Sequence, residues 1–248
     1  MFAVPPSEIT LLPDQVHVWR AALQPTQAAL TRMSGLLSAD EQARADRFYF
    51  QKDRDRFTLA RGILRCILGQ YLQVLPQTLQ FSYGSTGKPA LSHPPNAVHF
   101  NVSHSGQLAL YAVSLRSVGI DVEQINLDRP ILEIAQRFFS VTEQQELAML
   151  PPNLQPIGFF NGWTRKEALL KAIGTGLSLP LDQFSVSLSP HHPPKLLETA
   201  WDRAAINQWS IRSVDVGQGY AAAVVAAGTD WQWSGWQFRW EDPELNND

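Results

Sequence analysis

Residues 163–177, WTRKEALLKAIGTGL, place charged side chains among apolar ones at helical spacing, and Gly174 is placed to end such a helix. At about 100° per residue, one arc of roughly a quarter turn holds Phe160, Trp163, Glu167, Leu170 and Lys171. A carboxylate in an apolar arc should be neutralised, paired or metal-bound, because burying a bare charge is expensive. Taken alone, the segment favours a plainer interpretation, a surface pair between Glu167 and Lys171 worth a few tenths of a kcal/mol.

The composition predicts a folded, soluble chain, because 44% of its 248 residues are hydrophobic and 17% are charged. This length suits one large domain or two small ones. A net charge of −3 gives no indication of nucleic-acid binding. Cys66 is the only cysteine, so no internal disulfide can form and a reducing compartment is expected. We expect a cytoplasmic protein that does not enter a membrane, because the sequence has neither a signal-peptide pattern nor a run of about 18 apolar residues.

Hydrophobic periodicity predicts an α+β fold. Strands or hairpins are expected at residues 15–23, 79–91, 97–115, 118–125, 184–188, 209–216 and 220–227. Helices are expected at residues 38–72, 131–139, 140–150 and along the opening segment. In both halves a helix-rich part precedes a strand-rich part. We therefore predict two similar lobes, residues 1–116 and 117–248, each a small, mostly antiparallel sheet with packed helices, and an aromatic tail that packs back on the body.

The sequence GIDVE at residues 119–123 alternates as a strand does. Asp121 and Glu123 then share one face, roughly 7 Å apart at the rise of a strand. Like charges so placed repel unless a cation lies near them, and Mg²⁺ often binds one or two carboxylates together with substrate phosphates. Glu167 is a natural third ligand. The alternative is an exposed strand face with paired charges.

The sequence FNVSHS at residues 100–105 follows the same alternation, with Phe100 and Val102 toward the core and Asn101 and Ser103 away from it. Adjacent residues of a strand point to opposite sides, so Ser103 and His104 form a poor nucleophile–base couple. They suit hydrogen bonding to an oxyanion better. A structural role for the histidine is the alternative.

Two further basic features are candidates for phosphate binding. The sequence YGSTGKP at residues 83–89 is not a Walker loop, because proline and not serine or threonine follows Lys88. That lysine can still contribute charge to a phosphate, or it is a turn residue in water. Residues 41–65 carry seven basic side chains: Arg44, Arg47, Lys52, Arg54, Arg56, Arg61 and Arg65. A subset can form a pocket for a terminal phosphate, although a mixed charge run is usually a solvated helix face.

In order along the chain, TGKP (86–89), FNVSHSG (100–106), GIDVE (119–123), RFFS (137–140) and WTRKEALLKAIGTGLS (163–178) resemble the motifs of the Sfp-type 4′-phosphopantetheinyl transferases. Each motif alone is a weak signal. The resemblance runs from about residue 40 to residue 225. It implies a pseudo-twofold pair of lobes with coenzyme A held between them. It also implies transfer of the 4′-phosphopantetheine arm to a serine hydroxyl of an apo acyl or peptidyl carrier protein, with release of adenosine 3′,5′-bisphosphate.

The resemblance also implies the site residues. The metal ligands, for Mg²⁺ or Mn²⁺, fall on Asp121, Glu123 and Glu167. The catalytic residues fall on His104, Glu167 and Lys171. The coenzyme contacts fall on Arg44, Arg56, Arg61, Lys88, Ser103, His104 and Lys171. One departure is Glu41, where the family often has a basic residue, so the contacts to the 3′-phosphate of the coenzyme can differ.

In this scheme Glu167 takes the proton of the incoming serine, Lys171 steadies the charge on the departing phosphate, and His104 and Lys88 hold the diphosphate. Carrier domains tend to be acidic around their serine, so residues 131–141, with Arg137, Phe138 and Phe139, are the candidate docking surface. Its alternative is a buried helix. One cleft needs no more than a monomer.

Two other functions stay open from the sequence. One is a Mg²⁺-dependent hydrolase of coenzyme A or a nucleotide diphosphate, and the other is a carrier-binding module without activity. The sequence does not say whether the carriers belong to fatty-acid, polyketide or nonribosomal-peptide synthesis.

Overall fold

The computed structural model describes residues 1–24, 26–84, 87–93, 97–174 and 179–240. The first half contains β1 (Gln15–Ala22), α1 (Gln27–Leu36), α2 (Ala39–Ala45), α3 (Gln51–Leu72), η1 (Pro76–Thr78), β2 (Gln80–Tyr83), β3 (Pro89–His93), β4 (His99–Ser105) and β5 (Leu108–Ser114). The second half contains β6 (Val118–Gln124), α4 (Ile131–Phe138), α5 (Val141–Met149), α6 (Gln155–Ile173), η3 (Leu181–Gln183), β7 (Phe184–Val186), β8 (Leu196–Thr199), α7 (Ala205–Gln208), β9 (Trp209–Ser213), β10 (Tyr220–Ala227) and β11 (Gln232–Gln237).

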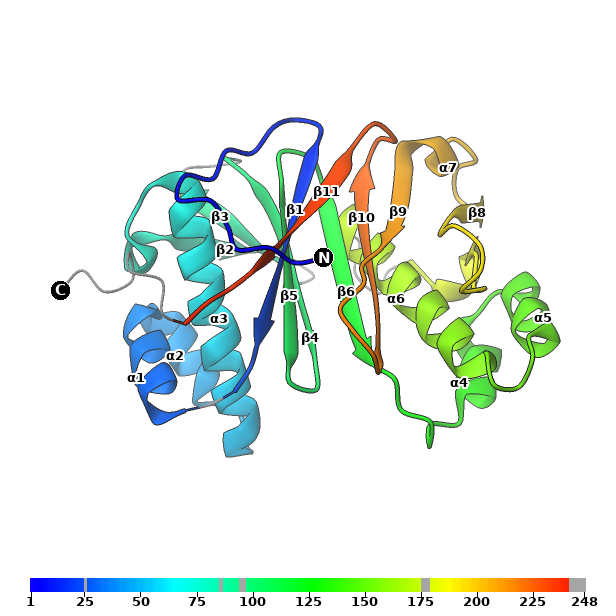
Figure 1. Ribbon diagram of the computed structural model, residues 1–248, viewed down its shortest axis with the longest axis horizontal. Helices are drawn as coiled ribbons and strands as arrows, with labels where there is room; N and C mark the ends of the chain where they lie inside the picture. The colour runs from blue at the N-terminus through cyan, green and yellow to red at the C-terminus, as the bar shows by residue number, and fades with distance from the viewer. Residues whose placement is uncertain (25, 85–86, 94–96, 175–178, 241–248) are drawn as a thin grey trace.

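Two sheets lie at the centre of the molecule, with helices on the outer side of each (Figure 1). The first sheet has the order β11-β1-β5-β4, and the second has the order β6-β10-β9. Within them every pair of strands is antiparallel except β1 with β11, which is parallel. The predicted α+β fold with small, mostly antiparallel sheets is confirmed.

Three clusters of buried apolar residues hold these layers together. The first lies between the first sheet and α1 and α3, and it includes Trp19 and Leu64. The second lies between the second sheet and α4 to α6, and it includes Phe160. The third joins the two sheets through residues such as Val18 and Val224. Because apolar burial is the dominant favourable term in folding, this third cluster keeps the edges of the two sheets together where the site forms.

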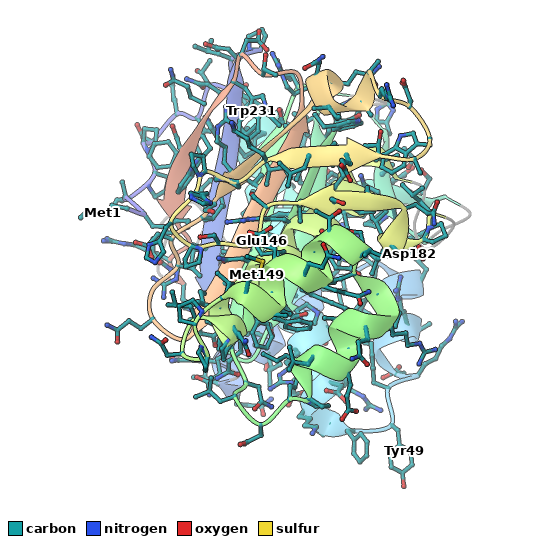
Figure 2. The ribbon with its side chains drawn as sticks, turned by 90° about the vertical axis from the view of Figure 1, so that its right-hand side faces the viewer. Met1, Tyr49, Glu146, Met149, Asp182 and Trp231 are labelled. Carbon is teal, nitrogen blue, oxygen red and sulfur yellow. The ribbon has the colours of Figure 1, made fainter. Side chains whose placement is uncertain are left out.

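Local sequence signals explain several element ends. Ser38 and Glu41 form the expected capping box at the start of α2, and Gly174 ends α6 with a left-handed φ of 83°. The helical stretch expected at residues 38–72 is two helices, because the chain leaves the helix between Ala45 and Gln51. The aromatic residues in that break are weaker helix formers than the residues around them. Tyr49 there is 92% exposed and points away from the body (Figure 2).

The aromatic tail returns to the first half of the molecule. β11 pairs with β1 in the first sheet, and Trp236 packs against the first cluster. We propose that residues 1–116 and 117–248 are two folding units, and that the last strand of the second unit, β11, joins the sheet of the first. Among the helices that the structure describes, none is both long enough and apolar enough to cross a membrane.

Candidate functional site

The site forms where β4, β6 and α6 meet. Gly119 lets α6 lie directly on β6, because a Cβ at this position would be 2.1 Å from the Ala168 carbonyl oxygen and 2.4 Å from the Ala172 nitrogen. No side chain fits in that space. The close contact brings the charged residues of α6 next to those of β6.

An open cavity of about 380 Å³ lies at this junction. Its described lining is Val102, Ser103, His104, Asp121, Glu123, Trp163, Glu167 and Lys171. The sequence-based hypothesis named six of these as metal ligands, catalytic residues or coenzyme contacts. The structure therefore brings together residues from three separate motifs. A larger cavity of about 590 Å³ lies over β7 and β8, and its described lining includes none of the predicted site residues.

The Lys171 ammonium pairs with a carboxylate of β6 and not with one of its own helix, α6. Its Nζ lies 2.6 Å from Asp121 Oδ1 and 3.2 Å from Ser103 Oγ. Ser103 Oγ also donates to Asp121 Oδ1 at 2.7 Å. Among the described residues no ion pair joins Glu167 to Lys171, so the surface pair considered from the sequence is not present. The lysine instead neutralises a carboxylate that is 3% exposed.

The two remaining carboxylates of the cavity have raised pKa values. For both Glu123 and Glu167 the main cause is removal from water, and the charge of Asp121 adds to it. Lys171 acts in the opposite direction on both. Because one cation faces three carboxylates, the cavity is short of positive charge.

The residues present fit a divalent cation with oxygen ligands. Asp121 Oδ2 is buried and has no hydrogen-bond partner in the described part of the chain, which is costly unless something else binds it. Within the same described residues, no three His, Cys, Asp or Glu side chains are arranged to hold a metal ion by themselves. Mg²⁺ does not need such a cage, because it commonly takes one or two carboxylates and completes its shell with water and substrate phosphates.

His104 lines the cavity near the end of β4 and remains in contact with solvent. Its pKa is lowered by removal from water and then by the positive charges of Lys171 and Arg56. Arg56, a predicted coenzyme contact, is thus within electrostatic range of this imidazole, although it is not part of the described lining of the cavity. Arg56 is half-exposed and makes a long ion pair with Asp53, at 4.0 Å.

Lys88 reaches the same junction from the first half of the chain. Its Nζ donates to the carbonyl oxygen of Lys171 at 2.5 Å and to that of Val118 at 3.4 Å. Burial lowers its pKa. Here the ammonium group lies at the last turn of α6, where the carbonyl groups of a helix end favour a cation. It is not part of the described lining of the cavity.

Arg44 and Arg61 lie in an aromatic cluster beyond the cavity. The guanidinium of Arg44 stacks over Phe57 and Tyr83, and that of Arg61 stacks over the same two rings and over Phe81. Arg44 is exposed, whereas Arg61 is 8% exposed.

An ion pair with Glu41 restricts the Arg61 side chain more than that of Arg44. Glu41 is fully buried, and its two carboxylate oxygens lie 2.7 Å from Arg65 Nε and 3.4 Å from Arg61 Nε. It also caps α2 through the Ser38 backbone N–H. The acid at this position therefore has a structural role, and it pairs with Arg61 as well as with Arg65.

Two expectations from the sequence need correction. Phe160 and Leu170, which share a helical arc with Glu167, lie in the second cluster and do not line the cavity, because α6 is covered on more than one side. In the candidate docking surface Phe139 is 1% exposed and belongs to the same cluster, so it is unavailable to a partner. Arg137 is exposed and Phe138 is partly buried. Residues 175–178, the end of the longest motif, lie outside the described residues.

The sequence analysis missed Ser105, whose hydroxyl donates to Glu123 Oε2 at 2.9 Å. It also gave no role to Asn101, which accepts the Ile120 N–H at 2.9 Å. The period-two alternation that singled out Ser103 includes both residues and would have found them.

Comparisons with known proteins identify the family of the chain. Residues 117–225 match the family described as the 4′-phosphopantetheinyl transferase superfamily, and residues 21–116 match the 4′-phosphopantetheinyl transferase N-terminal family. The 4′-phosphopantetheinyl transferase HetI of Nostoc sp. is 42% identical over 94% of this chain and 96% of its own length. The chain belongs to the 4′-phosphopantetheinyl transferase superfamily. The predicted family is thus confirmed.

One further relative is similar to most of the chain, and one solved structure matches less than half of it. The 4′-phosphopantetheinyl transferase Sfp of Bacillus subtilis is 36% identical over 80% of this chain and 86% of its own length. A solved holo-[acyl-carrier-protein] synthase of Thermotoga maritima covers 46% of this chain and 63% of its own, at 23% identity and a TM-score of 0.37. This 4′-phosphopantetheinyl transferase is an enzyme that moves the 4′-phosphopantetheine arm from coenzyme A to carrier proteins.

Proposed function

We propose that this transfer takes place in the cavity between β4, β6 and α6, and that it modifies a serine hydroxyl of an apo carrier domain. The observation that carries the proposal is the meeting of Ser103, His104, Asp121, Glu167 and Lys171 around one open cavity. Cationic, carboxylate and hydroxyl groups face one another there. Phosphoryl transfer depends mostly on positioning and charge stabilisation, and these groups supply both.

Glu167 is the proposed base. In the reaction the serine oxygen forms a bond to the phosphorus that carries the pantetheine arm, and the bond from that phosphorus to the bridging oxygen breaks. Adenosine 3′,5′-bisphosphate leaves with the bonding electrons. The serine proton passes to Glu167, directly or through a water molecule. The raised pKa of this carboxyl supports the assignment, because a base is more effective when its pKa lies closer to the working pH.

Cationic groups and a neutral hydrogen-bond donor are proposed to receive the charge that develops on the phosphates. Lys171 steadies the departing phosphate, and His104 and Lys88 hold the diphosphate. His104 can donate a hydrogen bond in its neutral form, which its lowered pKa favours. Arg44, Arg56 and Arg61 contact the rest of the coenzyme, with Arg44 the most accessible of the three. A guanidinium matches phosphate geometry, and its stacking on Phe57 and Tyr83 keeps it oriented.

Asp121, Glu123 and Glu167 are the proposed ligands of Mg²⁺ or Mn²⁺; these three side chains do not form a ready three-ligand group in the described structure, so they would have to draw together around the ion. When bound, the ion neutralises charge on the diphosphate oxygens. The unpartnered Asp121 Oδ2 supports these ligands, because a buried carboxylate oxygen without a partner favours a cation. The pKa values of Glu123 and Glu167 are raised mainly by removal from water and then by the charge of Asp121, and a cation would relieve this second effect. In the free protein the Lys171 ammonium supplies part of that charge to Asp121.

The carrier is proposed to dock beside the cavity, on the connection from β6 to α4 and on α4 itself. Leu127 is 75% exposed and Leu132 is 48% exposed, and the exposed Arg129 and Arg137 lie near them in sequence. Exposed apolar groups next to basic ones suit an acidic partner that also buries some apolar surface. One enzyme molecule contains the whole cavity, so a monomer suffices, and we propose a cytoplasmic location.

Mass spectrometry of apo carriers incubated with this enzyme, coenzyme A and Mg²⁺ tests the proposal. We expect one carrier serine to gain the mass of a phosphopantetheinyl group, with one adenosine 3′,5′-bisphosphate released for each carrier modified. Release of the nucleotide without carrier modification would instead indicate a hydrolase. Binding of coenzyme A with neither product would indicate a binding module. A panel of fatty-acid, polyketide and nonribosomal-peptide carriers defines which partners are served.

A further inference from the structure

β4 and β6 lie side by side although they belong to different sheets. Alternate side chains of β4 accept hydrogen bonds from alternate backbone N–H groups of β6. The three bonds are Ile120 N–H to Asn101 Oδ1 at 2.9 Å, Val122 N–H to Ser103 Oγ at 3.4 Å and Gln124 N–H to Ser105 Oγ at 3.0 Å. The sequence separation is 19 residues in each bond. These side chains therefore fix the register of the two strands, as a backbone ladder does within a sheet.

The serine at the end of this ladder makes a second hydrogen bond. Ser105 Oγ accepts from the Gln124 N–H and donates to Glu123 Oε2 at 2.9 Å. A hydroxyl has one donor and two acceptor sites, so both bonds form at once. The group that holds the end of β6 thus also fixes one oxygen of a carboxylate in the cavity.

The position of Ser105 is itself fixed by the turn that follows it. Gly106 has a left-handed φ of 59°, and a Cβ there would lie 2.6 Å from Gln124 Oε1 and 2.8 Å from Tyr220 Oη. The turn therefore lies directly against the second sheet.

We propose that Ser105 is a positioning residue for phosphopantetheinyl transfer, which orients Glu123 in the cavity. This inference rests on the proposed role of Glu123 as a ligand of the divalent cation. Partners that hold a ligating carboxylate fix its direction, and their removal typically costs 10- to 100-fold in metal affinity or activity. Ser105 touches neither coenzyme nor carrier in this proposal and acts through Glu123 alone.

Ser114 offers a matched control. It is a fully buried serine of β5 in the same sheet, and its hydroxyl donates to the Gln15 carbonyl oxygen at 3.1 Å and accepts from the Arg116 N–H at 3.3 Å. It does not line the cavity. Removing its hydroxyl tests what the loss of a structural serine does to the protein.

The test compares Ser105→Ala, Ser105→Thr and Ser114→Ala with the wild-type protein. Electron paramagnetic resonance measures Mn²⁺ binding to each free protein, and steady-state kinetics with an apo carrier separates kcat from the KM for coenzyme A. We expect Ser105→Ala to weaken Mn²⁺ binding and to lower kcat, each by about tenfold or more, with a smaller change in KM. Ser105→Thr restores both values because it restores the hydroxyl. Ser114→Ala lowers only the melting temperature.

Wild-type Mn²⁺ affinity and kcat in Ser105→Ala would overturn the proposal, and so would equal losses in Ser105→Thr or Ser114→Ala. Failure of the proposed function has a different signature. If the wild-type protein transfers the arm but binds Mn²⁺ no better than Glu123→Gln does, Glu123 is not a ligand, and an unchanged kcat in Ser105→Ala would then overturn the positioning role as well. If kcat falls in that case, Ser105 still positions Glu123, but the ligand role on which this inference rests is overturned.

Discussion

Replacing Gly119 by alanine should separate β6 from α6 at the point where they carry the cavity. The new Cβ would lie 2.1 Å from the Ala168 carbonyl oxygen and 2.4 Å from the Ala172 nitrogen. Both atoms belong to helix backbone, so neither can rotate away. Ordinary contact begins at 3.4 Å, which requires the helix to retreat by about 1.3 Å.

The retreat has two measurable consequences. Overpacking a close contact typically costs about 1–3 kcal/mol, which in a chain of this size lowers the melting temperature by about 2–4 °C for each kcal/mol. α6 also carries Glu167 and Lys171. The distance from Lys171 Nζ to Asp121 Oδ1, now 2.6 Å, would exceed hydrogen-bonding range if the ammonium moved with the helix. A misplacement of about 1 Å can cost about 100-fold in rate, so we expect kcat to fall by about that factor.

Thermal unfolding and carrier modification followed by mass spectrometry measure both consequences. Gly35→Ala is the control, because Gly35 lies within α1 with no atom within 4 Å of a new Cβ. We expect this control to keep full activity and at least wild-type stability, since alanine favours a helix more than glycine does. A Gly119→Ala protein with the wild-type melting temperature and kcat would refute the argument that this close contact sets the geometry of the site.

Three further predictions concern other parts of the molecule. Burial lowers the pKa of His17 from 6.5 to about 4, so this side chain is neutral in the folded protein near pH 7. The free energy of unfolding should be highest above pH 6.5. It should fall by up to about 3 kcal/mol as the pH decreases toward 4, because the unfolded chain then binds a proton that the folded protein does not. Urea unfolding of His17→Gln at pH 7 and pH 4.5 should show a weaker pH dependence than the wild type, and an equal one would contradict this assignment. Lys166→Met leaves the buried Glu143 carboxylate without its partner at 2.7 Å, and should lower the free energy of unfolding by about 3–5 kcal/mol; a loss below about 1 kcal/mol would show that the pair is not needed. Arg44→Gln should raise the KM for coenzyme A by about tenfold with little change in kcat, because it removes one charge-assisted hydrogen bond. An unchanged KM in steady-state assays would show that Arg44 is not part of the coenzyme site.

Local signals in the sequence predict much of the fold. The alternation of residues 97–115 and 118–125 predicts the β4–β5 hairpin and β6, because side chains of a strand point alternately to opposite faces. The capping box at Ser38 and the helix end at Gly174 depend on neighbouring residues only, and both were predictable for that reason. The parallel pairing of β11 with β1 was not, because it joins the two ends of the chain and no local pattern specifies the partner of a strand.

Candidate site residues could be predicted from the sequence when their type and spacing alone indicate the chemistry. Asp121, Glu123 and Glu167 were found in this way, together with the motif order along the chain. The partner of Lys171 was not, since a helical pattern favours its own Glu167 and only the packing of α6 on β6 brings Asp121 closer. The buried position of Phe160 likewise depends on which faces of α6 are covered, which is a property of tertiary packing.

A single-turnover assay of Glu167→Gln, with saturating coenzyme A, Mg²⁺ and an apo carrier, tests the proposed chemistry most directly. Glutamine keeps the size of the side chain but removes its ability to accept the serine proton and weakens its hold on a cation. We expect the protein to keep the wild-type melting temperature and to lose transfer by about 100- to 1,000-fold, the usual effect of removing one preorganised catalytic group. A folded Glu167→Gln protein that modifies the carrier at close to the wild-type rate would contradict the role assigned to this carboxylate.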